Sequence, residues 1–196
     1  MYDTDMPVIR DHGLASPEGL ADVITFCLLT IQQPLQQVAR QFEDVRQRGD
    51  ASPYLFYSKR AGYRYVNEHK AVLFAAVSKA VELGDVVACV DVLTVVPSLG
   101  MVKAAFVAQC LGMNVGCLDR HNLRALGFSE TAMRLAKSLK PDTRRAKIAA
   151  YVALTQQQGA RAWWDTWCTF VAGRRNSPLK TAEEVSRFHV TALQLA

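Results

Sequence analysis

The sequence predicts an all-α protein. Apolar residues recur at helical spacing through most of the 196 residues, and glycine or proline closes the periodic stretches. The chain is 50% apolar and 21% charged, which is the balance of a globular protein with one core. This composition excludes a disordered chain, a collagen-like fibre and a pure coiled coil. We expect eight to ten helices, no sheet, and a single compact unit over residues 1–196.

Capping residues mark the helices of the first half. Ser16 offers an N-cap side chain and Pro17 suits the first helical position. Gly49 and Gly84 are placed to end two later helices, since glycine readily takes positive φ. In chain order we expect a helix with apolar positions at 20–28, a helix at 35–48, a loop at 51–62, a helix at 66–83, and a segment at 85–95 that suits either helix or strand.

The second half carries further signals of the same kind. Residues 97–100 read as a tight turn, Asp119 as the cap of a short helix, and Thr181 with Glu184 as a capping box. The helices expected here span residues 101–111, 119–127, 129–139, 141–158, 160–172 and 182–195.

Charge and cysteine usage limit the cellular setting and the partners. The net charge of +5, from 23 Lys and Arg against 18 Asp and Glu, permits a polyanionic partner without requiring one. The five cysteines are odd in number and none forms a CxxC pair, so we expect free thiols rather than disulfides or a zinc ribbon. No apolar run is long enough to span a membrane, and no secretory signal is readable. We therefore expect an intracellular protein, cytoplasmic or nucleoid-associated, with no membrane partner.

One turn carries a chemical signal. Residues 95–112 read VVPSLGMVKAAFVAQCLG, a Pro-x-x-Gly turn directly before an apolar helix rich in small residues. Such a turn can present backbone N–H groups at a helix N-terminus, which is a binding site for a phosphate or another anion. An ordinary connection between two helices would show the same pattern, so the turn alone leaves both interpretations open.

Four segments in order resemble the helix-hairpin-helix DNA glycosylase superfamily, which has the endonuclease III-like fold. Val96–Gly100 with Ala104 resembles the hairpin L-P-G-V-G-x-x-x-A, and Leu118–His121 resembles the V-D-x-H that follows it after one helix. Upstream, residues 28–33 (LLTIQQ) resemble L-L-S-x-Q-x, and residues 62–71 (GYRYVNEHKA) resemble G-x-Y-x-x-K-A with a small insertion. The resemblance covers about residues 20–175, and it depends on the order and spacing of the four segments.

The resemblance implies a two-lobed fold that binds DNA in the cleft. One lobe would comprise about residues 20–118, with the hairpin at 96–100, and the other about 1–19 and 119–196. The implied activity is that of a DNA-base N-glycosylase, in which the Asp119 carboxylate stabilises the positive charge developing on the sugar of a flipped base. Gln32 would fill the space left by that base. The other DNA contacts would come from Ser98, Gly100, Met101, Lys103, Arg174 and Arg175.

The sequence departs from the family at three points. Ser98 stands where the hairpin has its first glycine, so the backbone there must accept a Cβ. Val102 occupies the position of the Schiff-base lysine of bifunctional members, which implies a monofunctional enzyme. Its neighbour Lys103 is the second catalytic candidate beside Asp119, although we expect a DNA-backbone or surface lysine here rather than the nucleophile. Only Cys168 follows Asp119, so the family's iron–sulfur cluster is excluded. An alkali cation on the hairpin carbonyls near residues 96–99 is the one cofactor left open.

Two other functions fit the same resemblance. Phage relatives of the superfamily are thought to be transferases that modify thymine in DNA. A non-catalytic DNA-binding or virion-associated protein would retain Asp119 only as a helix cap.

Two further sets of residues have both a structural and a functional interpretation. Core packing is expected over base stacking for Trp163, Trp164 and Trp167, and solvated surface over phosphate binding for Arg144, Arg145 and Lys147.

Overall fold

The prediction of an all-α protein is confirmed. The computed structural model describes residues 2–31, 33, 35–129, 131–136, 138–174 and 177–193, with the backbone alone at 36, 120, 121 and 125. The described residues form ten helices and no strand, and 70% of them are helical. The helices are α1 (Tyr2–Ala15), α2 (Pro17–Thr30), α3 (Leu35–Arg48), α4 (Ser58–Glu82), α5 (Val86–Leu93), α6 (Met101–Cys110), α7 (Arg120–Ala125), α8 (Pro141–Gln156), α9 (Ala160–Ala172) and α10 (Ala182–Ala192).

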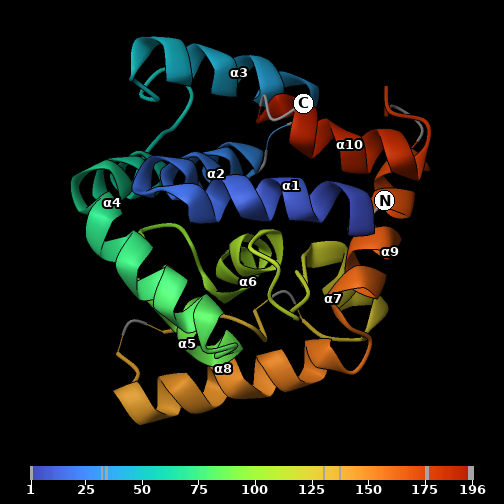
Figure 1. The fold of residues 1–196 in the computed structure, drawn as a ribbon. Helices are drawn as coiled ribbons and strands as arrows, with labels where there is room; N and C mark the ends of the chain where they lie inside the picture. Colours follow the sequence, from blue (N-terminus) through green and yellow to red (C-terminus); the bar gives the residue numbers. More distant parts are fainter. Residues whose placement is uncertain are drawn as a thin grey trace.

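The helices surround α2 and α6 (Figure 1). α2 packs on α1, α3, α4 and α6, while α10 packs on α1, α3 and α9. α8 closes the opposite side of the molecule by packing on α5 and α9. The buried apolar side chains form one cluster that runs from Met6 to Leu193. Helices of the two expected lobes pack on each other: α10 packs on α3, and α8 packs on α5. The division into two lobes remains a prediction.

The predicted caps are in place. Ser16 Oγ accepts a hydrogen bond from the Gly19 N–H at 3.0 Å, and Pro17 opens α2. Thr181 and Glu184 form the complete capping box of α10. Asp85 caps α5 by accepting from the Ala88 N–H at 2.9 Å, so the ambiguous segment 85–95 is helical at 86–93. The glycines that end helices or turns with positive φ are Gly49, Gly84, Gly112, Gly127 and Gly159.

Three elements differ from the prediction. α1 lacks a readable helical pattern because Pro7 interrupts it, and burial of Met6 and Ile9 holds it in place. α4 begins at Ser58, eight residues before the expected start at Val66. The helix expected at 129–139 is wrong: its described residues form turns, and none of them is buried. Met133 and Leu135 pack only partly buried against the core, and a short segment that buries so little apolar surface does not form a stable helix.

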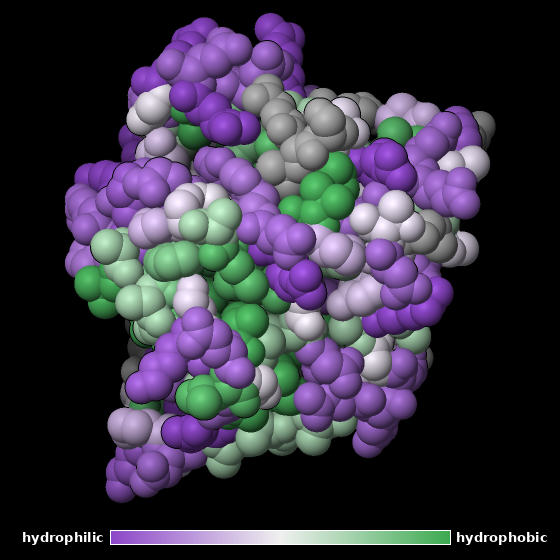
Figure 2. Space-filling view, viewed as in Figure 1, coloured by the Kyte–Doolittle hydropathy of each residue, from purple (hydrophilic) through white to green (hydrophobic). Residues whose placement is uncertain are grey.

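The surface of the molecule is mixed. In the view of Figure 2 most residues are hydrophilic, and apolar residues gather where Figure 1 shows α4, α5 and α6. Among the described residues, no helix combines the length and the apolar character needed to cross a membrane.

Candidate functional site

The hairpin between α5 and α6 has the backbone of a glycine turn although a serine occupies it. Ser98 has φ +71°, in the left-handed region that glycine prefers. Its hydroxyl lies 2.7 Å from the Ser58 hydroxyl at the start of α4, and the two share a hydrogen bond. The Cβ of Ser98 is therefore compatible with a tight hairpin, and the strained backbone is held by a neighbouring helix.

The N-terminus of α6 is open. Its N-cap residue, Gly100, is exposed, supplies no side-chain hydrogen bond, and has no atom near the place where a Cβ would lie. The Lys103 and Ala104 N–H groups bond to the Gly100 carbonyl, each at 2.9 Å. The N–H groups of Met101 and Val102 occupy the first two helical positions, where the helix itself provides no acceptor. Because the Met101 side chain is buried, this residue offers an anion only its backbone N–H.

Contacts from α4 join the hairpin to the end of α2. The Lys59 ammonium donates to the Ile31 carbonyl at 2.6 Å, while Ser58 contacts Ser98. Gly62 lies so close to the hairpin that a Cβ there would stand 2.3 Å from the Pro97 carbonyl oxygen. The end of α2, the start of α4 and the hairpin thus form one surface. Gln32 and Arg175, two of the expected DNA contacts, lie outside the described residues.

Two exposed aromatic residues on this surface were not predicted from the sequence. Tyr57 is 95% exposed with φ +51°, and its neighbour Phe56 is 56% exposed. Both lie directly before Ser58, beside the hairpin. Backbone strain clusters at binding and catalytic sites, which makes this pair a candidate contact surface. The loop position alone could not reveal them, because Leu55 in the same loop is buried in the core.

Asp119 lies half-buried at the start of α7. Its Oδ1 accepts a hydrogen bond from the Asn122 N–H at 3.0 Å, so the predicted capping role is confirmed. The side chains of Arg120 and His121 are outside what the structure describes. Capping a helix and stabilising a developing positive charge both use a carboxylate, so the two roles are compatible at this position.

Lys103 is set deeper than a surface lysine. Its side chain is half-buried, and its ammonium lies 5.4 Å from the centroid of the Phe106 ring. Burial, the largest influence, opposes the charged form of Lys103, yet its pKa is raised overall by the acidic groups around it: Cys117, Cys27, Asp119 and Cys110. The three thiols are themselves protonated at neutral pH and act on Lys103 only where they ionise, at high pH. A protonated amine has no lone pair for nucleophilic attack, and it attracts an anion.

All five cysteines are free. Burial raises the pKa of Cys27 to about 11 and those of Cys89, Cys117 and Cys168 to about 12, so these thiols stay protonated and unreactive. No group of His, Cys, Asp or Glu in the described part of the chain could hold a metal ion.

Other basic and aromatic candidates serve the architecture. Arg144 donates to the Asp91 carboxylate at 2.7 Å and also to Thr94, which ties α8 to α5. Arg145 pairs with Asp85 at 3.5 Å, and Lys147 donates to the Arg134 carbonyl at 2.7 Å.

Trp163 and Trp164 are buried and Trp167 is partly buried against the core, so their expected core role is confirmed. Arg174 is exposed just after α9, and its phosphate contact remains a prediction.

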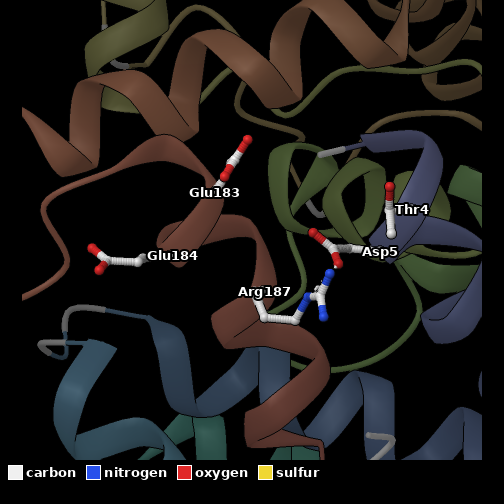
Figure 3. A pocket seen from close by; sticks show the side chains of 5 residues that line it. All are labelled: Thr4, Asp5, Glu183, Glu184 and Arg187. Carbon is white, nitrogen blue, oxygen red and sulfur yellow. Dashed lines mark hydrogen bonds and ion pairs between the residues drawn. The ribbon is translucent and has the colours of Figure 1, made fainter.

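Two cavities lie away from the hairpin and from Asp119. The larger, of about 420 Å³, opens between α1 and α10 and is lined by Thr4, Asp5, Glu183, Glu184 and Arg187 (Figure 3). In it Arg187 donates to Asp5 at 2.9 Å, and Ser186 donates to the same carboxylate at 2.5 Å. The smaller, of about 210 Å³, lies between α1 and Gly112. The Asp5 contacts anchor the N-terminal helix.

Comparison with known proteins found no family model, no curated protein and no solved structure that matches this chain.

Proposed function

We propose that the chain binds DNA through the hairpin and hydrolyses the N-glycosidic bond of an extruded base with Asp119. The observation that carries the proposal is the link between these two parts. Lys103 stands in the first turn of α6 after the hairpin, and the Asp119 carboxylate is one of the groups that raise its pKa. In the proposal, a phosphate bound at the hairpin places the sugar of the same DNA strand in reach of this carboxylate.

The chemistry follows from charge. As the bond between base and sugar breaks, positive charge develops on the sugar ring, and an ionised carboxylate stabilises it. The same carboxylate can orient a water molecule for attack on the sugar. The capping bond from the Asn122 N–H to Oδ1 fixes the Asp119 carboxylate at the start of α7. Lys103, as a charged ammonium, would contact a phosphate, which agrees with a monofunctional reaction.

The aromatic pair before α4 supports DNA as the partner. An exposed ring can stack on any base, and stacking stabilises DNA that has been opened or kinked. Tyr57 and Phe56 stand beside the hairpin, where they would meet the duplex next to the bound phosphate. The open N-terminus of α6 and the rings would thus hold neighbouring parts of one DNA molecule.

A non-catalytic DNA-binding protein is the second candidate. It is favoured by the capping bond of Asp119 Oδ1 to the Asn122 N–H, which accounts for this carboxylate without any chemistry. Single-turnover assays of base release, on duplexes with lesions or mismatches, separate the two functions when wild type is compared with Asp119→Asn. Base release that depends on Asp119 supports the enzyme, and DNA binding without any release supports the second candidate.

A further inference from the structure

The backbone just before Asp119 is held by a buried phenol. Tyr151, in the middle of α8, is 2% exposed, and its hydroxyl accepts a hydrogen bond from the Leu118 N–H at 2.9 Å. The same hydroxyl donates to the Gly116 carbonyl at 2.8 Å. One oxygen atom thus satisfies two buried backbone groups within the three residues that precede Asp119.

The segment that Tyr151 holds has no regular structure of its own. Residues 113–119 form neither helix nor strand, so their backbone groups need partners from elsewhere. On the other side, Asn122 Nδ2 donates to the Cys117 carbonyl at 2.9 Å. Gly116 lies against the Trp163 ring, where a Cβ would stand 2.3 Å from a ring carbon. Each of these contacts fixes the loop, and Tyr151 bonds to it at two points.

The phenol keeps both hydrogen bonds over the working pH range. Burial, with the nearby Cys117 and Asp119, raises the pKa of Tyr151 well above its usual value, although the Leu118 hydrogen bond opposes this. Tyr151 therefore stays protonated and remains both donor and acceptor.

We propose that Tyr151 is a positioning residue that fixes the Asp119 carboxylate by holding residues 116–118. This inference rests on the proposed function of Asp119. Catalysis by charge stabilisation needs the carboxylate at a fixed distance from the sugar, and a displacement of about 1 Å can cost about a hundredfold in rate. Loss of the phenol oxygen leaves the Leu118 N–H and the Gly116 carbonyl unpaired, and the loop must shift to hydrate them.

The test uses two abasic duplexes that differ in charge. One carries a pyrrolidine in place of the sugar, which is cationic at neutral pH, and the other carries a neutral tetrahydrofuran. The ratio of their dissociation constants reports how well a carboxylate faces the sugar. Wild type should prefer the pyrrolidine duplex at least tenfold, and Tyr151→Phe should reduce this preference to within about twofold. Its affinity for the tetrahydrofuran duplex should stay unchanged.

Ser186→Ala is the matched control. Ser186 is fully buried, and its hydroxyl also makes two hydrogen bonds: it donates to Asp5 and accepts from the Trp164 indole N–H. These residues are far along the chain from Asp119. This variant should lose comparable stability and keep the full pyrrolidine preference. An equal loss of preference in Ser186→Ala and Tyr151→Phe would mean that Tyr151 acts only through global stability, which overturns the proposal.

A second variant keeps the test decisive if the phenylalanine protein does not fold. Site-specific 4-aminophenylalanine at position 151 retains the ring and a donor for the Gly116 carbonyl, but its nitrogen is a poor acceptor for the Leu118 N–H. At constant pH its pyrrolidine preference should lie between those of wild type and Tyr151→Phe. A preference equal to that of wild type overturns the proposal.

Asp119→Asn separates this inference from the proposed function. If wild type and Asp119→Asn show the same preference, the proposed role of Asp119 fails. If Asp119→Asn loses the preference and Tyr151→Phe keeps it, only the role of Tyr151 fails.

Discussion

Gly62 of α4 and Pro97 of the hairpin are in direct backbone contact. A Cβ at position 62 would lie 2.3 Å from the Pro97 carbonyl oxygen, and a backbone atom cannot turn aside as a side chain can. The glycine therefore sets how closely the hairpin approaches α4. Its presence is explained by this approach, since Gly62 lies inside a helix where glycine is otherwise unfavourable.

Replacing Gly62 by alanine tests this contact. We expect Gly62→Ala to lower the free energy of unfolding by about 2 kcal/mol in urea titrations, because the hairpin must move. We also expect weaker DNA binding in fluorescence anisotropy. Gly173→Ala is the control: its Cβ would meet only ordinary contacts, from 3.4 Å outward, and its stability should change by less than about 0.5 kcal/mol. Equal stability of the two variants would contradict the proposed contact.

Ser98 provides a test of the hairpin backbone. A left-handed conformation costs a non-glycine residue about 1–2 kcal/mol, whereas glycine adopts it freely. Ser98→Gly relieves this strain but loses the hydrogen bond to Ser58, so its unfolding free energy should stay within about 1 kcal/mol of wild type. Ser98→Val should be the less stable variant, since branching at Cβ makes positive φ worse. If the valine variant matches the glycine variant in urea unfolding, the backbone there is not left-handed in solution.

The exposed ring of Tyr57 gives a third prediction. If it stacks on a base, Tyr57→Ala should weaken DNA binding by about 1–3 kcal/mol without loss of thermal stability. Val72→Ala is a suitable control, because Val72 is 71% exposed on α4, away from the hairpin. Anisotropy titrations that give both variants the affinity of wild type would remove Tyr57 from the DNA surface.

His189 makes stability depend on pH. Burial lowers its pKa to about 4, and the charge of Lys103 adds to this, while hydrogen bonds to Val185 and Ser186 and the charge of Asp5 oppose it. The ring lies among aromatic residues of α2, α6, α9 and α10, including Trp164 at 4.9 Å. In the unfolded chain the histidine pKa is about 6.5, so only the unfolded state takes up this proton as pH falls from about 6.5 to 4.

We therefore expect acid to destabilise wild type through this group. Between pH 7.5 and 5.0, urea unfolding should show that wild type loses about 2 kcal/mol more than His189→Phe, whose ring suits the aromatic surroundings. Other groups titrate equally in both proteins and cancel from the difference. Parallel losses in the two proteins would show that His189 is accessible to protons in the native state.

The sequence predicted those parts of the fold that local chemistry determines. Ser16 and Thr181 cap their helices as short polar side chains do, and Asp119 does the same. α1 could not be predicted, because Pro7 breaks its pattern and only contacts with distant residues stabilise it. Residues 129–139 show the opposite case, in which a helical pattern buries too little apolar surface to form a helix.

The candidate site was predictable only in part for the same reason. The hairpin and Asp119 are readable as motifs, but the surface they share with α4 depends on contacts across the chain. Lys59 with Ile31, and Ser58 with Ser98, are 28 and 40 residues apart in sequence. The bonds of Tyr151 to the Asp119 loop cross 33 and 35 residues, and no motif marks them.

The most direct test of the account is base release by wild type and by Asp119→Asn under single-turnover conditions. Asparagine caps a helix as well as aspartate does, so this variant removes the charge and keeps α7. The account predicts that wild type frees a base and leaves an unnicked abasic site in at least one lesion-bearing or mismatched duplex. Asp119→Asn should bind that duplex equally well and release the base at least about a hundredfold more slowly. Equal rates of release from the two proteins, or no release from any duplex, would contradict it.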